Sequence, residues 1–267
     1  MPQREKTRTE MWPQSLEWHV TWHWLEKYLP EDGVILDAGG GPGRYTIELA
    51  KRGYDVVLLD IDKKQLRRAR EKIQERGVEE KVKIIHGSVT KLKDLESDTF
   101  DAVLCLGGVL TGLTSIDGEK RLTEKRERMK AIQQLKRVCQ VEAPIFLGLC
   151  GLALVLSTWI GFFPDHIKDL PAFLDTHLLQ PKGETEKYFF HGHYFTPKEA
   201  KDLVGKQGLH VENVVGLQGP AAPVLPLLED IEDKEKKDII REICVKTSDM
   251  PGMASISAHF LVICFKR

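Results

Sequence analysis

The sequence predicts an α/β fold, with one mostly parallel sheet that is covered by helices on both faces. Short apolar runs alternate with segments of helical spacing along the chain, which indicates strand-helix-strand units with right-handed crossovers. The apolar runs are nearly continuous, as is typical of strands buried on both faces. With 267 residues, of which 42% are hydrophobic, the chain can bury a large core in one elaborated domain.

Seven segments have the composition of strands. They are expected at Val34–Asp37, Tyr54–Asp60, Val82–Ile85, Phe100–Leu106, Pro144–Leu149, Leu209–Val215 and His259–Phe265. Spacing, caps and glycine stops predict helices at Leu16–Leu29, Arg44–Arg52, Lys63–Arg76, Glu119–Val138, from Pro197 to Gly208, and at Glu229–Val245. Between the fifth and sixth strands the pattern is less regular, and it mixes a buried apolar helix with several prolines.

The most informative segment is the turn after the first strand, which reads Asp-Ala-Gly-Gly-Gly-Pro-Gly from Asp37 to Gly43. Glycine is needed where φ is positive or where a ligand approaches the backbone too closely for a Cβ. The residues from Arg44 onward have helical spacing, so the loop leads into a helix N-terminus with unpaired N–H groups. A dinucleotide fingerprint would place a glycine where Arg44 stands, and the Gly-Lys-Ser/Thr of a P-loop is absent. The loop therefore predicts backbone contact with a small molecule and disfavours a dinucleotide.

On these residues, Leu36 to Gly43, the chain resembles motif I of the class I S-adenosylmethionine-dependent methyltransferases. The overall pattern is similar to uncharacterised bacterial and archaeal small-molecule methyltransferases of the ubiquinone/menaquinone-biosynthesis-like group. The resemblance implies a Rossmann-like sheet whose last strand is antiparallel and enters as a hairpin edge. It implies S-adenosyl-L-methionine as cofactor and S-adenosyl-L-homocysteine as product. It also implies four parts, namely an N-terminal helical lid (1–32), a cofactor-binding core (33–150), a cap insertion (151–195) and a C-terminal part of the same sheet (196–267).

The resemblance assigns cofactor contacts to the ends of four strands. Asp60, at the end of the second strand, is expected to accept hydrogen bonds from the ribose hydroxyls, as ligands bind at the carboxyl ends of parallel strands. Ser88 departs from the acidic residue that the family often has after the third strand, although its hydroxyl can still accept a hydrogen bond. The full set of expected contacts is Asp37, Gly39, Gly40, Gly41, Gly43, Arg44, Tyr45, Asp60, Ile61, Ser88, Val89, Leu106 and Gly107.

The methyl acceptor is less well determined. The Asn/Asp-Pro-Pro-aromatic motif and the Pro-Cys nucleophile of nucleic-acid methyltransferases are absent, and the formal net charge is −1. A small-molecule acceptor is therefore favoured, and nucleic acid is not expected as a partner. His191 and His193, among aromatic residues in the cap, are the candidate catalytic bases. Alternatively, this segment is a strand before the next helix, or its histidines are satisfied core residues.

Three other functions stay open on the sequence. A methyltransferase-fold protein can bind the cofactor without catalysis, as a sensor or scaffold, and an RNA or protein methyltransferase is a further alternative. A dehydrogenase-like nucleotide binder is disfavoured by the glycine register.

Cysteine usage and hydropathy give the remaining expectations. The five cysteines are scattered and lack CxxC pairs, so we expect reduced thiols, with Cys105 a buried strand residue rather than a nucleophile. His19 and His23 have an i, i+4 spacing without a third ligand, so ring packing among Trp18, Trp22 and Trp24 is favoured and no metal site is expected.

The apolar stretch from 143 to 163 fits a core strand and a buried helix better than a membrane span. With a polar first segment, a cytoplasmic monomer or homodimer is expected.

Overall fold

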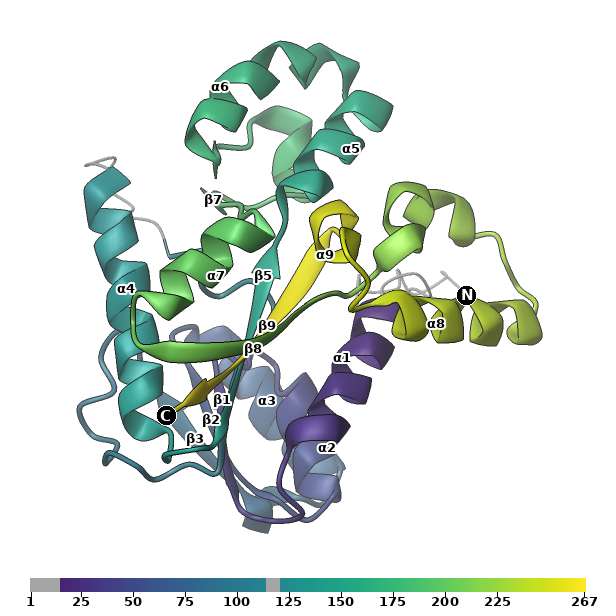
Figure 1. Cartoon of the computed structure of the whole chain (residues 1–267). Coiled ribbons are helices and arrows are strands. Elements are labelled where there is room, and N and C mark those ends of the chain that lie inside the picture. Colours follow the sequence, from purple (N-terminus) through teal and green to yellow (C-terminus); the bar gives the residue numbers. More distant parts are fainter. Residues whose placement is uncertain (1–14, 114–120) are drawn as a thin grey trace.

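A seven-stranded sheet forms the centre of the protein, and the computed structural model describes residues 15–113 and 121–267 (Figure 1). The strand order is β3-β2-β1-β4-β5-β9-β8. The strands are β1 (Val34–Ala38), β2 (Asp55–Asp60), β3 (Val82–His86), β4 (Ala102–Cys105), β5 (Pro144–Cys150), β8 (Leu209–Gly216) and β9 (His259–Lys266). The first five are parallel, and β9 is antiparallel to both of its neighbours. The prediction of a Rossmann-like, mostly parallel sheet with an antiparallel last strand is confirmed.

The position of the last strand differs from the expectation of a hairpin edge. β9 lies between β5 and β8, so β8 is the edge strand. The residues from Phe260 to Cys264 are fully buried. A strand that is apolar on both faces is stable inside a sheet and would be a liability at its edge.

Helices cover both faces of the sheet, and the alternation of side chains along the strands separates two cores. One core joins the sheet to α4 (Arg121–Val138) and α7 (Pro197–Gly205). The other joins it to α1 (Ser15–Tyr28), α2 (Arg44–Lys51) and α8 (Lys234–Thr247), beside a small cluster under α3 (Lys63–Glu75). The N-terminal helix is thus a packed layer of the domain, and its expected role as a lid over the cofactor stays a prediction.

Several element ends differ from the predicted ones. β4 is shorter than expected because Phe100 makes only an isolated bridge, to Cys139. α8 begins at Lys234 because the Asp233 side chain caps it by accepting from the N–H of Lys236. The predicted start of the helix before the fifth strand, Glu119, lies outside the described residues.

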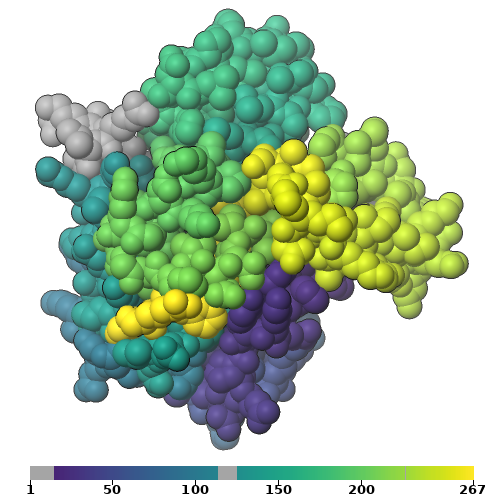
Figure 2. Space-filling view, viewed as in Figure 1, coloured from purple at the N-terminus to yellow at the C-terminus, as the bar shows by residue number. Residues whose placement is uncertain are grey.

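The chain between β5 and α7 folds into a cap at one end of the sheet (Figure 1). Its elements are α5 (Leu152–Phe162), the 3-10 turns η3 (Pro164–Asp169) and η4 (Gly183–Lys187), α6 (Leu170–Thr176), β6 (Leu178–Leu179) and β7 (Gly192–His193). In the space-filling view the cap forms a lobe above the rest of the molecule (Figure 2). It has an apolar core of its own, built around Trp159, Phe163, Phe173 and Tyr194.

The apolar stretch from 143 to 163 divides into a strand and a helix, as predicted, but the helix is less buried than expected. β5 is buried along its whole length, whereas α5 buries mainly Val155 and Trp159 and leaves Ile160 and Phe162 exposed. Among the described residues, no helix combines the length and apolar character needed to cross a membrane.

Candidate functional site

The glycine loop after β1 is shaped by left-handed backbone at three of its residues. Gly39, Gly41 and Gly43 have φ values of +81°, +56° and +79°. The N–H of Gly39 donates to the carbonyl of Leu59 at 2.6 Å, and the N–H of Gly43 donates to Gly40 at 3.0 Å. These bonds fix the loop against the end of β2, in a conformation that residues with a Cβ rarely adopt.

Not every glycine in the loop serves the same purpose. A Cβ on Gly39 would collide with the side chain of Val109, from the loop after β4, so this position is needed for packing. A Cβ on Gly41 would meet nothing within 4 Å, and the same holds for Gly107 at the end of β4. Gly41 and Gly107 therefore each border open space, on two loops that approach each other at Gly39 and Val109.

This open space lies at the switch point of the sheet. β1 pairs with β2 on one side and with β4 on the other, so the order along the chain reverses here. Ligands of open α/β sheets bind in the crevice outside the carboxyl ends of the strands at such a point. The loops that carry Gly41 and Gly107 are thus where a ligand of this fold is expected.

Asp60 joins the second strand end to the glycine loop. Its Oδ2 accepts from the N–H of Gly41 at 2.9 Å, and its Oδ1 accepts from the N–H of Asp62 at 2.8 Å. A carboxylate offers about four acceptor positions, so two remain for hydroxyl groups of a ligand. Ile61, next along the chain, has 69% of its surface exposed and is free to cover an aromatic ring.

Asp37 lies behind the loop and not at its surface. It is 1% exposed, and its Oδ2 accepts from both the hydroxyl (2.6 Å) and the backbone N–H (3.2 Å) of Thr46. The N-cap of α2, Gly43, has no side chain, so Asp37 takes over the capping of the first turn. Burial raises the pKa of Asp37 to about 6, against the opposing effect of the Thr46 hydrogen bonds. Asp37 therefore holds the first turn of α2, and with it the end of the glycine loop.

Arg44 and Tyr45 begin α2 and pack on the N-terminal helix. The guanidinium of Arg44 lies 4.3 Å from the centre of the Trp18 ring, and the Tyr45 ring lies 4.7 Å from it. Burial raises the pKa of the Tyr45 hydroxyl. The tryptophans expected to pack among themselves therefore also hold the residues that follow the glycine loop. His23 packs edge-on against Trp24 at 5.6 Å, in line with the preference for ring packing.

The third strand end is arranged by local hydrogen bonds. The hydroxyl of Ser88 lies 2.9 Å from that of Thr90 and also accepts from the N–H of Thr90. Val89 is buried in the core on the α4 side. His86, which was not among the predicted site residues, also lies at this strand end, with its Nε2 3.0 Å from the carbonyl oxygen of Ile61. The strand register could have indicated it, because His86 pairs with Asp60.

The end of β4 has a buried side and an exposed side. Leu106 is buried in the second core, whereas Gly107 is exposed with a φ of +67°. Cys105 is fully buried, and burial raises the pKa of its thiol to about 12. A thiol of this kind is protonated at neutral pH and is a poor nucleophile. All five cysteines are free and buried.

The structure separates the two candidate catalytic histidines. His191 is exposed and lies next to Phe190, whose ring closes on the loop after β4 so that a Cβ on Gly108 would come within 3.2 Å of it. His193 is 7% exposed, and its ring lies 4.7 Å from the ring of Phe195. The backbone N–H of His193 donates to the carbonyl of Thr111 at 2.9 Å, which anchors the cap to the same loop.

A cavity of about 550 Å³ lies between α4, α7 and β7. His193 forms part of its wall, and His191 does not. Four basic and two acidic side chains give it a mixed, mostly positive lining. The lining residues are Lys125, Arg128, Met129, His193, Phe195, Thr196, Lys198, Glu199, Asp202, Leu203, Lys206 and Gln207.

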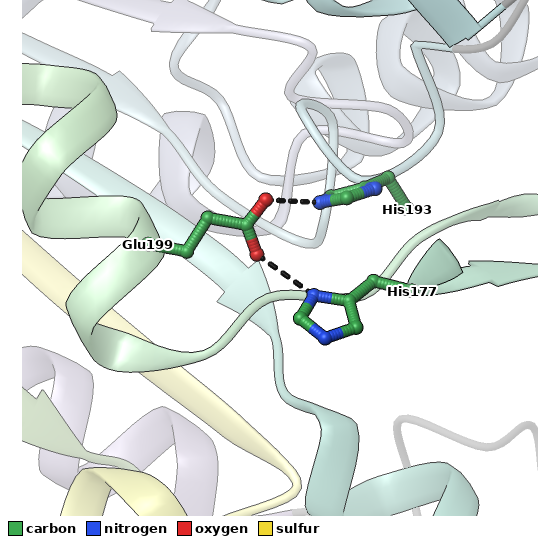
Figure 3. Close-up of side chains that lie close together, drawn as sticks. All are labelled: His177, His193 and Glu199. Carbon is green, nitrogen blue, oxygen red and sulfur yellow. Dashed lines mark hydrogen bonds and ion pairs between the residues drawn. The ribbon is translucent and has the colours of Figure 1, made fainter. Parts of the chain in front are cut away.

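His193 also belongs to a group of three polar side chains that the sequence did not reveal (Figure 3). Its Nε2 lies 2.6 Å from Oε1 of Glu199, whose Oε2 lies 3.0 Å from Nδ1 of His177. Although burial opposes ionisation, the hydrogen bonds with His193 and His177 lower the pKa of Glu199 to about 2. Burial lowers the pKa of His193. His177 and His193 are 16 residues apart, and His193 and Glu199 are 6 residues apart. These spacings could not predict the group, because the conformation of the cap was unknown from the sequence.

The comparisons with known proteins agree with this geometry. Residues 35–140 match the model of the methyltransferase domain. The chain is 35% identical over 71 residues to the tRNA 5-carboxymethoxyuridine methyltransferase of Escherichia coli, a match that covers 25% of this chain and 27% of that protein. The chain thus aligns with only about a quarter of the length of this curated relative.

Solved structures extend the similarity over nearly the whole chain. An S-adenosylmethionine-dependent methyltransferase from Methanosarcina mazei is 22% identical, with a TM-score of 0.60, covering 91% of this chain and 96% of that one. One from Listeria monocytogenes is 15% identical, with a TM-score of 0.57, covering 95% and 99%. Residues 35–140 are therefore similar to a methyltransferase domain, and the chain has the fold of these S-adenosylmethionine-dependent methyltransferases.

Proposed function

We propose that this protein transfers a methyl group from S-adenosyl-L-methionine to a small molecule by direct displacement. The observation that carries the proposal is the open space at Gly41, beside the Asp60 carboxylate and at the switch point of a methyltransferase-like sheet. The methyltransferase domain at residues 35–140 supports the same cofactor.

Each strand end has a part in holding the cofactor. Asp60 accepts from the ribose hydroxyls with its unused acceptor positions, and the exposed Ile61 covers the adenine. Ser88 and Val89 border the adenine edge. Gly41 and Gly107 leave room for the nucleoside and the methionine portion, and the Arg44 guanidinium lies where it can pair with the methionine carboxylate.

The remaining loop residues act on the backbone. Gly39, Gly40 and Gly43 allow the tight turn. Asp37 holds the first turn of α2 by its bonds to Thr46. Tyr45 packs this turn against Trp18 and so keeps Arg44 in place.

The chemical step needs orientation more than covalent catalysis. When bound, the cofactor supplies a sulfonium methyl group that the acceptor attacks in line with the departing sulfur. The protein then has to align the two reactants and exclude water. The cap is suited to this role because Phe190 covers the loop that follows Gly107. An oxygen acceptor would also need a base, for which His191 and His193 are the candidates.

A small-molecule acceptor is supported by the cavity of about 550 Å³ between α4, α7 and β7 and by the near-neutral net charge. The expected resemblance to the ubiquinone/menaquinone-biosynthesis-like group, which rests on the sequence pattern alone, makes phenols and quinols the acceptors to test first. The one observation in favour of RNA is the name of the Escherichia coli relative, and that match covers only 71 residues. We also retain the expectation of a cytoplasmic monomer or homodimer.

A methyl-donor assay tests the proposal. The full chain is incubated with isotope-labelled S-adenosyl-L-methionine and separate panels of phenols, quinols, amines, carboxylic acids and unmodified tRNA. Label transfer to a small molecule is the expected result. Transfer to tRNA alone would overturn the small-molecule assignment. Tight cofactor binding without transfer to any panel would favour a sensor or scaffold.

A further inference from the structure

We propose that His177, His193 and Glu199 form a binding site for one divalent transition-metal ion of the Zn²⁺ type. The proposal does not depend on the cofactor, although it assigns one of the two candidate bases, His193, to the metal. The three residues come from the end of α6, from β7 and from the first turn of α7. Their ligand atoms all lie within 4.8 Å of one another.

The donor set fits such an ion. Two imidazole nitrogens and one carboxylate are the ligands of many catalytic zinc sites, and they also suit other first-row divalent ions. With metal-ligand bonds of about 2.0–2.2 Å, tetrahedral ligands lie about 3.4 Å apart. The nitrogen-to-oxygen separations are 2.6 Å for His193 and 3.0 Å for His177. Each has to widen by less than about 1 Å, which small side-chain rotations can supply.

The ring atoms that face Glu199 determine how each histidine would bind the ion. Nε2 of His193 and Nδ1 of His177 face the carboxylate, so in the metal-bound form the ring proton of His193 sits on Nδ1 and that of His177 sits on Nε2.

The backbone holds the three residues in place without the ion. The carbonyl of His177 accepts from the N–H of Tyr194 at 2.8 Å, which ties α6 to β7. Glu199 is in the first turn of α7, and its N–H donates to the Thr196 cap. His177 adopts a left-handed φ of +57° at the end of α6, where glycine would terminate a helix with less strain. The presence of histidine here points to a use for its side chain.

The site also has access and room for further ligands. His193 and Glu199 line the cavity of about 550 Å³ between α4 and α7. A water molecule or an oxygen of a bound molecule can complete the coordination from that side. Arg128 lines the same cavity, so an anion is the favoured additional ligand. The assignment makes His193 a metal ligand and leaves the exposed His191 as the histidine available for proton transfer.

Zinc titration of the full chain tests the proposal. The protein is stripped with a chelator, dialysed and titrated with Zn²⁺ by calorimetry, and Co²⁺ absorption in the visible range reports the coordination. We expect one Zn²⁺ per chain with micromolar or tighter affinity. Glu199→Gln, which is nearly isosteric, and His177→Ala should each weaken binding at least tenfold and remove the Co²⁺ bands.

Two matched variants control for the loss of a histidine or a carboxylate nearby. His191→Ala removes an exposed histidine of the same cap, and Asp202→Asn removes a carboxylate from the same helix and cavity wall. Both should bind Zn²⁺ like the unmodified protein. Circular dichroism and thermal unfolding check that each variant is folded. The proposal is overturned if the unmodified protein binds no Zn²⁺ more tightly than about 100 μM, or if folded Glu199→Gln and Asp202→Asn bind it equally well.

Discussion

The glycine loop and the cap lie at the same end of the sheet but are specified by the sequence in different ways. The loop is formed by five consecutive residues, Gly39 to Gly43, and lies against the end of β2. Its key contact joins Gly41 to Asp60. The cap brings together His177, His193 and Glu199 only after several short elements have packed on their own core. Local chemistry therefore determines the proposed donor site, whereas tertiary packing determines the region expected to hold the acceptor.

The largest expected effect tests the loop. Gly41→Val should weaken binding of S-adenosyl-L-homocysteine by at least about 100-fold, or about 2.8 kcal/mol, because the added carbons occupy the open space. Calorimetry measures the change. Gly77→Val is the matched control, since Gly77 has a similar φ of +63° and equally open surroundings, after α3. Equal affinity of the two variants would show that Gly41 does not face the ligand.

A second effect concerns the support behind the loop. The pKa of Asp37 rises from 3.8 to about 6 on folding, so the folded protein retains a proton that the unfolded chain has released in that interval. The contribution of this group to stability is therefore complete below pH 4 and is lost as the pH rises through about 6. The difference between a pKa of 3.8 and one of about 6 corresponds to about 3 kcal/mol in the free energy of unfolding.

The substitution Asp37→Asn removes this titration and keeps an oxygen that can accept from Thr46. The free energy of unfolding of the variant, minus that of the unmodified protein, should increase by about 2–3 kcal/mol between pH 4 and pH 7. Denaturant unfolding without cofactor at several pH values measures it. A difference that is constant with pH would contradict the assignment.

Asp60→Ala should weaken S-adenosyl-L-homocysteine binding by about 1.5–3 kcal/mol, the range for lost charge-assisted hydrogen bonds. Calorimetry again gives the value. Asp62→Ala is the control, because Asp62 caps α3 close by without contacting the glycine loop in the described hydrogen bonds. If both variants bind equally, the ribose contact has been assigned to the wrong carboxylate.

A smaller effect separates the two ends of α2. Arg44 and Arg52 both stack on tryptophans of α1, at 4.3 Å and 4.1 Å. Only Arg44 adjoins the loop, so Arg44→Ala should lower the affinity two- to fivefold, or about 0.5–1 kcal/mol, and Arg52→Ala should leave it unchanged. Similar losses in both variants would indicate an effect of α1 packing alone.

The smallest expected effect on the donor comes from the cap. Phe190→Ala should leave S-adenosyl-L-homocysteine affinity within about twofold, because the contacts assigned to the cofactor lie on the strand ends. It should lower kcat/KM for the acceptor found in the methyl-donor assay. A large loss of donor affinity would mean that the cap belongs to the donor site.

The sequence predicted the sheet well because its strands carry their own pattern. The β5 run and the Thr196–Pro197 helix start were recognisable locally, and the structure confirms them. The insertion of β9 beside β5 was missed because strand order depends on partners far apart in sequence, from 109 residues between Cys150 and His259 to 121 residues between Pro144 and Phe265. The apolar composition of β9, which is typical of a strand buried on both faces, could have indicated that it lies inside the sheet.

The same contrast holds for the candidate site. Asp60 and Gly41 could be identified because strand ends converge at one edge of a parallel sheet. Phe190 and the His177 group could not, since a left-handed residue after a short helix and a two-stranded pairing decide where their side chains lie. The two candidate catalytic histidines, His191 and His193, also differ in burial, because β7 spans only two residues.

We propose that the loop from Gly39 to Gly43 and Asp60 bind a methionine nucleoside. Calorimetric titration of the unmodified full chain with S-adenosyl-L-homocysteine and, separately, with NAD⁺ tests it most directly. We predict one S-adenosyl-L-homocysteine per chain with micromolar affinity and no detectable heat from NAD⁺. Tighter binding of NAD⁺, or binding of neither ligand, would contradict the claim.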